Sequence, residues 1–173
     1  DLTHKGALTG IRVEGPTNSV DQRIKRLSKE LDLLENEYSV LDNEQSNIFW
    51  KKTKNLEVFS NTEKNLLRVV VPVSETLNFL QKLKNVDLSY FLDWGGSLIW
   101  LELNDISIKI LNELKDITKD HNGYFTLIKV EEDMKASADI FTIDPIKYKI
   151  SEKIKKSFDP RRIFNPGKMY TGI

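Results

Sequence analysis

The order of strand and helix signals between Leu66 and Val130 places the strongest constraint on the fold. Its first stretch, LLRVVVPV, is β-branched and nearly continuous, which is typical of a buried strand. Trp94-Gly95-Gly96 separates two later apolar stretches and indicates a hairpin. The predicted elements are strand 66–73, a helix from Ser74 to Lys84, strands 87–93 and 97–103, a helix from Ile106 to Asp120, and strand 124–130.

This β-α-β-β-α-β order is that of a ferredoxin-like core. We therefore predict an α+β fold whose antiparallel sheet carries its helices on one face. An extra strand, Ala7–Glu14, precedes the core and is available to extend the sheet; a helix with an apolar stripe from Val20 to Leu34 follows it. A C-terminal helix, Ile146–Ser157, leads to the tail. We expect a single domain over residues 1–173, of which 146–173 are the C-terminal helix and docking tail.

Composition excludes several classes of site and partner. Lys plus Arg and Asp plus Glu number 26 each, so the net charge calls for neither nucleic acid nor an anionic membrane. The chain has no cysteine, which excludes disulfides, iron–sulfur clusters and thiolate zinc sites within it. Its two histidines, His4 and His121, have no ligand-like neighbours, so we predict no metal site. No apolar run approaches the roughly 20 residues of a transmembrane helix.

Two features indicate that the chain is a fragment that lacks its own nucleotide site. It begins Asp1-Leu2 without Met, so its true N-terminus is expected elsewhere. It contains neither G-x-G-x-x-G nor G-x-x-x-x-G-K-[ST], the two phosphate-cradling patterns. A strand follows Gly95-Gly96, so this pair is a hairpin turn and not a pyrophosphate loop.

The last sixteen residues, FDPRRIFNPGKMYTGI, form an unusually specific ending for a chain terminus. Pro160 ends the preceding helix at Asp159, because proline disfavours helical geometry in the residue before it. Asn165-Pro166-Gly167 predicts a tight turn with positive φ available at Gly167. The pattern fits a helix end with a docked tail, and it also fits a functional segment.

Two further residues are candidates for a substrate site. Arg12 has the opposite parity to Ile11 and Val13, so it faces outward or into a cleft, where its guanidinium could pair with a small carboxylate. A plain surface arginine fits the same pattern. Trp94, at the hairpin tip, is either an aromatic lid or sheet packing.

The tail resembles the C-terminus of the FAD-linked oxidases of the vanillyl-alcohol-oxidase type, through the pattern F-D-P-x-x-I-[LF]-N-P-G-[KR]-[MI]. Its final M-Y-x-G-[IV] is similar to the family of FAD-binding E subunits of bacterial glycolate oxidases. Three internal stretches resemble the same family in the same order: Ile11–Gly15 followed by a helix, YFLDWGGSLIWL from Tyr90, and GYFTLI from Gly123. Together they span residues 11–173.

The resemblance implies the cap part of a flavin-dependent subunit that oxidises glycolate or a related 2-hydroxy acid. FAD would be held mainly by an N-terminal domain that this fragment lacks, and the fragment alone is expected to be inactive. Asn165, Gly167 and Lys168 would be the cofactor-side residues, and Arg12 and Trp94 remain the substrate candidates. The implied partners are the other flavin and iron–sulfur subunits, in the cytoplasm or at a membrane through those subunits.

One departure from the family pattern concerns catalysis. Tyr124 stands where the family's Gly-His-x-Thr-Leu pattern has histidine, so no catalytic base is assigned. The alternative hypothesis is a non-catalytic ferredoxin-like module that binds a partner or RNA through its sheet. RNA binding of this kind needs an RNP pattern on the central strands, and no strand here carries one.

Overall fold

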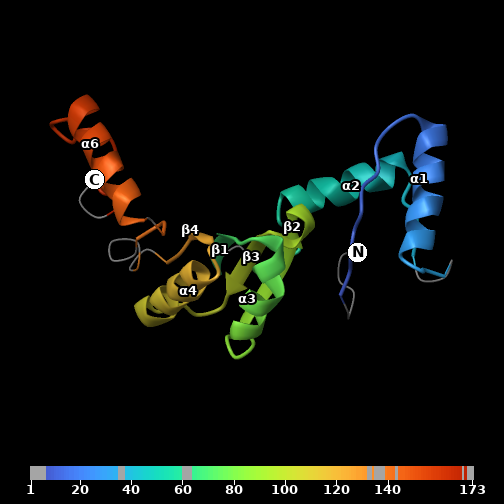
Figure 1. Cartoon of the computed structure of the whole chain (residues 1–173), viewed down its shortest axis with the longest axis horizontal. Coiled ribbons are helices and arrows are strands. Elements are labelled where there is room, and N and C mark those ends of the chain that lie inside the picture. The colour runs from blue at the N-terminus through green and yellow to red at the C-terminus, as the bar shows by residue number, and fades with distance from the viewer. Residues whose placement is uncertain are drawn as a thin grey trace. The chain divides into compact units, whose positions relative to one another are not determined.

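A computed structural model describes residues 7–34, 38–59, 64–131, 134, 139–142, 144–168 and 170 (Figure 1). Where the sequence predicted one domain, the chain divides into two compact units, Asp1–Ser60 and Asn61–Ile173. We call them the N-terminal unit and the sheet unit and describe each by itself. None of the helices in the described ranges is long and apolar enough to cross a membrane.

The N-terminal unit contains two helices, α1 (Thr17–Glu30) and α2 (Asn43–Lys54). A capping box begins α2: Asp42 accepts a hydrogen bond from the backbone N–H of Gln45, and the Gln45 side chain accepts one from the backbone N–H of Asp42. Helix α1 has the predicted amphipathic pattern but buries none of its residues. In the described part of this unit only Thr53 is buried.

The predicted strand Ala7–Glu14 is wrong: these residues form no strand and join no sheet. Leu8 and Ile11, within this range, are more than half exposed. Apolar alternation predicts a strand only where a neighbouring strand supplies the hydrogen bonds, and the described N-terminal unit supplies none.

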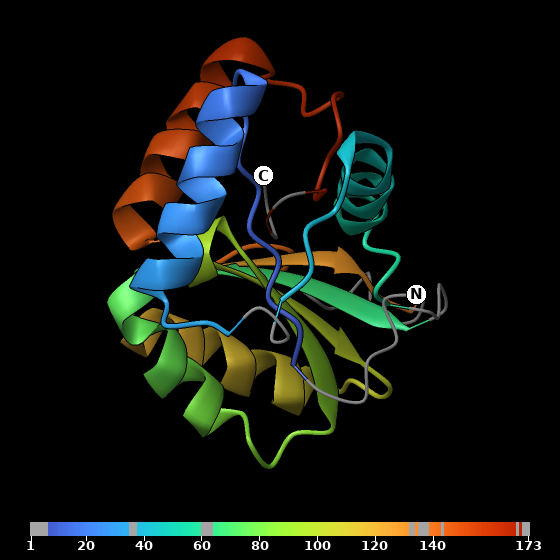
Figure 2. The same cartoon turned by 90° about the vertical axis from the view of Figure 1, so that its right-hand side faces the viewer.

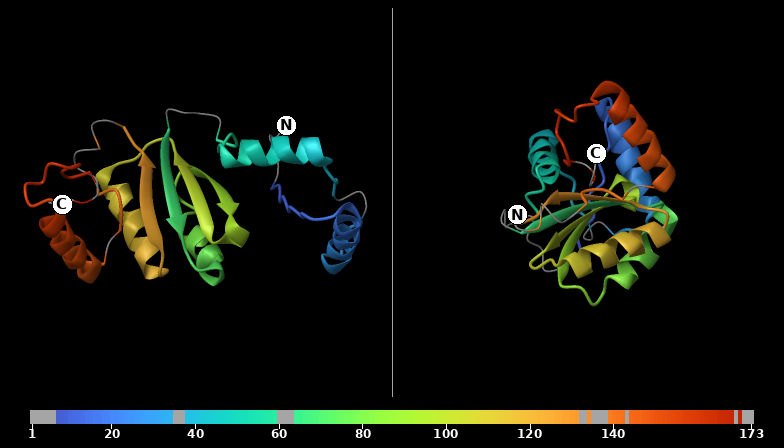
Figure 3. Two further views of the ribbon diagram at one scale, coloured as in Figure 1. Left: turned by 90° about the horizontal axis from the view of Figure 1, so that it is seen from above. Right: turned by 90° about the vertical axis from the view of Figure 1, so that its left-hand side faces the viewer.

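The sheet unit has the predicted ferredoxin-like order. Its strands are β1 (Asn65–Val70), β2 (Leu88–Asp93), β3 (Leu98–Leu103) and β4 (Tyr124–Lys129). They pair antiparallel in the spatial order β2-β3-β1-β4, which Figure 3 shows face-on. The connections are the short 3₁₀ helix η1 (Val73–Glu75) with α3 (Thr76–Lys82), the turn η2 (Trp94–Gly96), and α4 (Ile108–Asp120).

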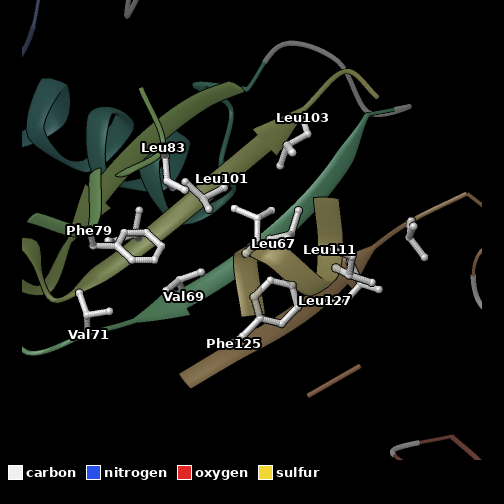
Figure 4. Packing of buried hydrophobic residues seen from close by; sticks show 13 residues of the cluster. Leu67, Val69, Val71, Phe79, Leu83, Leu101, Leu103, Leu111, Phe125 and Leu127 are labelled. Carbon is white, nitrogen blue, oxygen red and sulfur yellow. The ribbon is translucent and has the colours of Figure 1, made fainter. Parts of the chain in front are cut away.

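Helices α3 and α4 lie together on one face of the sheet (Figure 2). The core lies between them and that face, where alternate strand residues such as Leu67, Val69 and Leu101 are fully buried (Figure 4). Phe79 of α3 and Leu111 of α4 complete it from the helix side. The predicted α+β fold with helices on one face is confirmed.

Between the end of α4 and the start of β4, the backbone at Gly123 packs very closely against neighbouring atoms. A Cβ at Gly123 would lie 2.7 Å from Val71 Cγ1, 2.8 Å from Thr118 Cγ2 and 2.8 Å from the carbonyl oxygen of Val70. Only glycine therefore lets the end of α4 lie this close to β1.

The C-terminal helix α6 (Pro145–Phe158) follows the core. The Asp144 carboxylate caps it by accepting hydrogen bonds from the backbone N–H groups of Ile146 and Lys147, and Pro145 occupies the first helical position. The helix ends at Phe158, before Asp159-Pro160, as the sequence predicts. Ile146, Ile150 and Ile154 form an exposed apolar stripe along it.

Candidate functional site

The second face of the sheet, formed by the strand side chains that point away from α3 and α4, carries the most distinctive chemistry. On β1, buried residues alternate with the half-buried Leu66, Arg68 and Val70, so these three belong to the second face. The register brings side chains of four strands and the segment after β4 into one cross-strand row: Phe91, Trp100, Arg68, Thr126 and Phe141. A guanidinium therefore lies in a mostly aromatic row.

Arg68 contacts the tip of the β2–β3 hairpin. Its Cζ lies 5.2 Å from the centre of the Trp94 ring, a cation–π contact. The hairpin holds Trp94 in place, because the Asp93 carboxylate accepts a 2.7 Å hydrogen bond from the Trp94 backbone N–H. Gly95 and Gly96 supply positive φ angles of 64° and 100°. The predicted hairpin is confirmed, and Trp94 remains 59 % exposed above the guanidinium.

A second cation–aromatic pair lies at the same end of the sheet. Tyr124 is the register partner of Val70, the second-face residue next after Arg68 on β1. The Nζ of Lys147, on α6, lies 4.9 Å from the centre of the Tyr124 ring and donates to the Tyr124 hydroxyl at 3.4 Å. Arg68 is half-buried and Lys147 is exposed, so both cations are more accessible than a core residue.

The buried acidic group of the second face, Glu102, is already paired. Glu102 is buried, and its carboxylate accepts a 3.2 Å hydrogen bond from Lys64 in a salt bridge. Two cations beside aromatic rings, with the one buried carboxylate neutralised, form a surface suited to a small carboxylate ligand lying against a flat ring. Among the described residues no group of three His, Cys, Asp or Glu could hold a metal ion.

Asp159 organises the start of the tail. Its carboxylate accepts 2.9 Å hydrogen bonds from the backbone N–H groups of Ile163 and Phe164 and forms a 2.8 Å ion pair with Lys155. The hydrogen bond from Lys155, together with those two backbone bonds, lowers the pKa of Asp159 from its ordinary 3.8 to about 2. Lys155 also donates to the carbonyl oxygen of Phe164. The turn is thus fixed while Ile163 and Phe164 stay largely exposed.

The three predicted cofactor-side residues lie together in the next turn. Asn165 has a φ of 46° and Gly167 a φ of 69°, and the Lys168 N–H donates to the Asn165 carbonyl oxygen at 3.2 Å. Nothing lies within 4 Å of a Cβ built at Gly167, so this backbone is open to another surface. The predicted tight turn with positive φ at Gly167 is confirmed; the role of these residues toward a cofactor stays a prediction.

The tail then returns to the edge of the sheet. The Tyr170 ring lies 5.8 Å from the Phe141 ring and 6.1 Å from the Tyr148 ring, centre to centre. Phe141 is the last member of the cross-strand row through Arg68. The last residues of the M-Y-T-G-I ending, 171–173, and Met169 lie outside the described part of the chain.

The two predicted substrate residues have different surroundings. Arg12 forms a 2.6 Å salt bridge with Glu14 in the N-terminal unit, while Trp94 belongs to the sheet unit. The cation in contact with Trp94 is Arg68, which the sequence reasoning did not select. A signal existed, since Arg68 is the single charge in LLRVVVPV. Lys147 had no such signal among the many lysines of α6.

The N-terminal unit contains a groove of about 1040 Å³ between α1, α2 and residues 8–15. Apolar side chains of both helices line it, including Val20, Leu27 and Phe49. Comparison with family models, curated proteins and solved structures finds no match to this chain.

Proposed function

We propose that this chain is the cap and C-terminal tail of a flavin-dependent oxidoreductase subunit that oxidises glycolate or a related 2-hydroxy acid. The observation that carries the proposal is the pair of cation–aromatic contacts, Arg68 with Trp94 and Lys147 with Tyr124, on the second face of the sheet. The four motif resemblances, in family order, point to the same chemistry.

The residues present fit a covering role toward FAD. The second face offers Trp100 and Phe91 to a flat ring system, and the tail offers an open backbone at Gly167. The sequence contains no phosphate cradle, so the pyrophosphate would be bound by a separate domain. When bound, the flavin supplies the acceptor for the hydride removed from the 2-hydroxy acid.

The chain's own residues would bind and orient the substrate. The guanidinium of Arg68 would pair with the substrate carboxylate, held in position by the Trp94 ring. Lys147 would add positive charge beside the Tyr124 hydroxyl, which takes the place of the family's histidine as a hydrogen-bonding group. Trp94 would exclude water from the bound acid.

The test uses Arg68→Gln in the complete subunit. Because charged hydrogen bonds contribute about 1.5–3 kcal/mol, KM for glycolate should rise roughly 10- to 100-fold with flavin content unchanged. Arg26→Gln is the matched control, since Arg26 is an exposed residue of α1 that pairs with Glu30 four residues on. If KM is the same in both variants, Arg68 does not bind the acid.

A second test concerns the cofactor. The isolated chain should be colourless after purification, and added FAD should not bind to it. The complete subunit should carry oxidised flavin that glycolate bleaches. Stoichiometric FAD on the isolated chain would contradict the assignment of the phosphate site to another domain.

The alternative is a non-catalytic ferredoxin-like module that binds a protein partner. The exposed stripe Ile146, Ile150 and Ile154 on α6 favours it, because exposed apolar patches mark interaction surfaces. A complete protein that binds no flavin and does not respond to 2-hydroxy acids would support this alternative.

A further inference from the structure

The two edges of the sheet differ in whether a described segment is hydrogen-bonded to them. Residues 140–142 cover the outer edge of β4: Leu127 N–H donates to the Ile140 carbonyl at 2.8 Å, and Thr142 N–H donates to the Phe125 carbonyl at 3.2 Å. The Thr142 hydroxyl accepts from the Phe125 N–H at 3.0 Å. Along the outer edge of β2, no described residue forms a strand or bridge.

The sequence of β2, LSYFLD, lacks the devices that protect an edge strand. It has no proline and no lysine, it runs for six residues, and it pairs with β3 in one continuous register. Tyr90 and Leu92 are 53 % and 37 % exposed on the side of the strand that faces α3 and α4. A regular edge of this length, whose one charged residue is Asp93 at its end, is a template for another strand.

We propose that β2 pairs antiparallel with β2 of a second copy of this chain, across a two-fold axis at Phe91. A two-fold axis perpendicular to the sheet keeps each face on its own side, so only residues of the same parity can be opposite. Centred on Phe91, the register places Phe91 opposite Phe91, Tyr90 opposite Leu92, and Ser89 opposite Asp93. Apolar side chains face apolar ones, and the carboxylate of β2 faces a hydroxyl.

The position of the Asp93 carboxylate favours this register over the two neighbouring registers, which are centred on Tyr90 and on Leu92. Centred on Tyr90, the pairing would place Asp93 opposite Asp87, two like charges across the strands. Centred on Leu92, it would place the Asp93 carboxylate against the Phe91 ring. The register at Phe91 is the one of the three that opposes no like charges and sets no carboxylate against a ring.

The dimer leaves the Lys147–Tyr124 part of the proposed binding site free, while Trp94, which directly follows β2, lies opposite Leu88 at the end of the seam. In the order β2-β3-β1-β4, β2 is at the opposite edge from β4, which carries Tyr124 and the covering residues 140–142. Pairing through β2 joins two four-stranded sheets into one and places both second faces on the same side. Two Arg68 sites would thus face one way.

The absence of cysteine from the chain allows a clean test of the register. Phe91→Cys should form a disulfide-linked dimer on mild oxidation, because directly opposed residues bring their Cβ atoms within about 5.5 Å. Tyr90→Cys alone should not link, but should form a mixed dimer with Leu92→Cys. Lys129→Cys, at the other edge of the sheet, is the control and should form no disulfide-linked dimer.

Sedimentation of the unmodified chain tests the dimer itself. The chain should show concentration-dependent dimerisation, and Leu92→Lys should weaken it at least about tenfold, since an isologous interface places each substitution twice. Leu92 is partly exposed, so lysine is accommodated in the monomer, and unchanged circular dichroism would confirm its folding. A chain that stays monomeric at every concentration, linkage at Lys129→Cys equal to that at Phe91→Cys, or self-linkage of Tyr90→Cys would each overturn the proposal.

Discussion

Asp159 couples the C-terminal helix to the tail through one carboxylate with three partners. Its folded pKa of about 2 lies below the ordinary 3.8, so the contribution of Asp159 to stability is complete above about pH 4 and is lost as pH falls toward 2. The amide resonances of Ile163 and Phe164 should therefore shift with a midpoint near pH 2. Lys155→Met removes the largest cause and should raise that midpoint toward the ordinary value. An identical midpoint in both proteins would contradict the role of Lys155.

Gly123 tests how closely α4 packs against β1. Gly123→Ala places a Cβ against a backbone carbonyl that cannot rotate away, so we expect a loss of about 3 kcal/mol of unfolding free energy, at the upper end of overpacking costs. Gly95→Ala is the matched control: its φ is 64° but nothing lies within 4 Å, so the cost should be about 1 kcal/mol. Urea unfolding measures both, and equal losses would mean that the close approach relaxes freely.

Single residues differ in how visible their roles are in the sequence. The turn at Asn165 to Gly167 and the hairpin at Trp94 were predictable, because their backbone angles require particular residue types. The contact of Arg68 with Trp94 was not, since it joins residues on separate elements and depends on the register of β1 with β3. Arg12 and Glu14 are two positions apart in the sequence, but the sequence alone did not predict that they form a salt bridge.

Among the elements, the tail turn offers the sharpest test of the docking surface. Gly167→Val puts a branched side chain at a φ of 69°, where the backbone now lies open. In the complete subunit it should lower bound flavin per protein, while the midpoint of thermal unfolding changes little because the core cluster from Leu67 to Val130 does not include the tail. Asn165→Ala should act in the same direction but less. An early melting transition with normal flavin content would make the tail a structural clamp.

The success of the strand predictions followed from how each strand is paired. The core strands alternate or run apolar because helices cover one face and neighbouring strands supply their hydrogen bonds. Residues 7–14 have a similar local pattern but no partner strand in the described unit, so the same pattern gave a wrong prediction. Local periodicity identifies a face that can be buried, and pairing decides whether a strand forms.

The two units of the chain differ in how many of their apolar residues are buried. The sheet unit buries a contiguous apolar cluster, whereas no apolar residue in the described part of residues 7–59 is buried. Helix α1 has a strong apolar stripe, yet its members remain at least partly exposed beside the groove. A stripe without a covering surface contributes little to stability, because the hydrophobic free energy scales with the apolar area removed from water.

This difference predicts the pattern of amide exchange in the isolated chain. Peptides from β1 and β3, with Leu67 and Leu101 fully buried, should exchange slowest and report global unfolding. Peptides from α1 should exchange through local opening, faster by orders of magnitude, since helices of this length are marginal without tertiary packing. In the complete subunit the proposed flavin domain should cover the groove and slow exchange in α1 and α2, while β1 and β3 change little. Hydrogen exchange measured by mass spectrometry resolves the four segments. If α1 is already as protected as β1 in the isolated chain, the N-terminal unit has a stable core of its own and needs no covering domain.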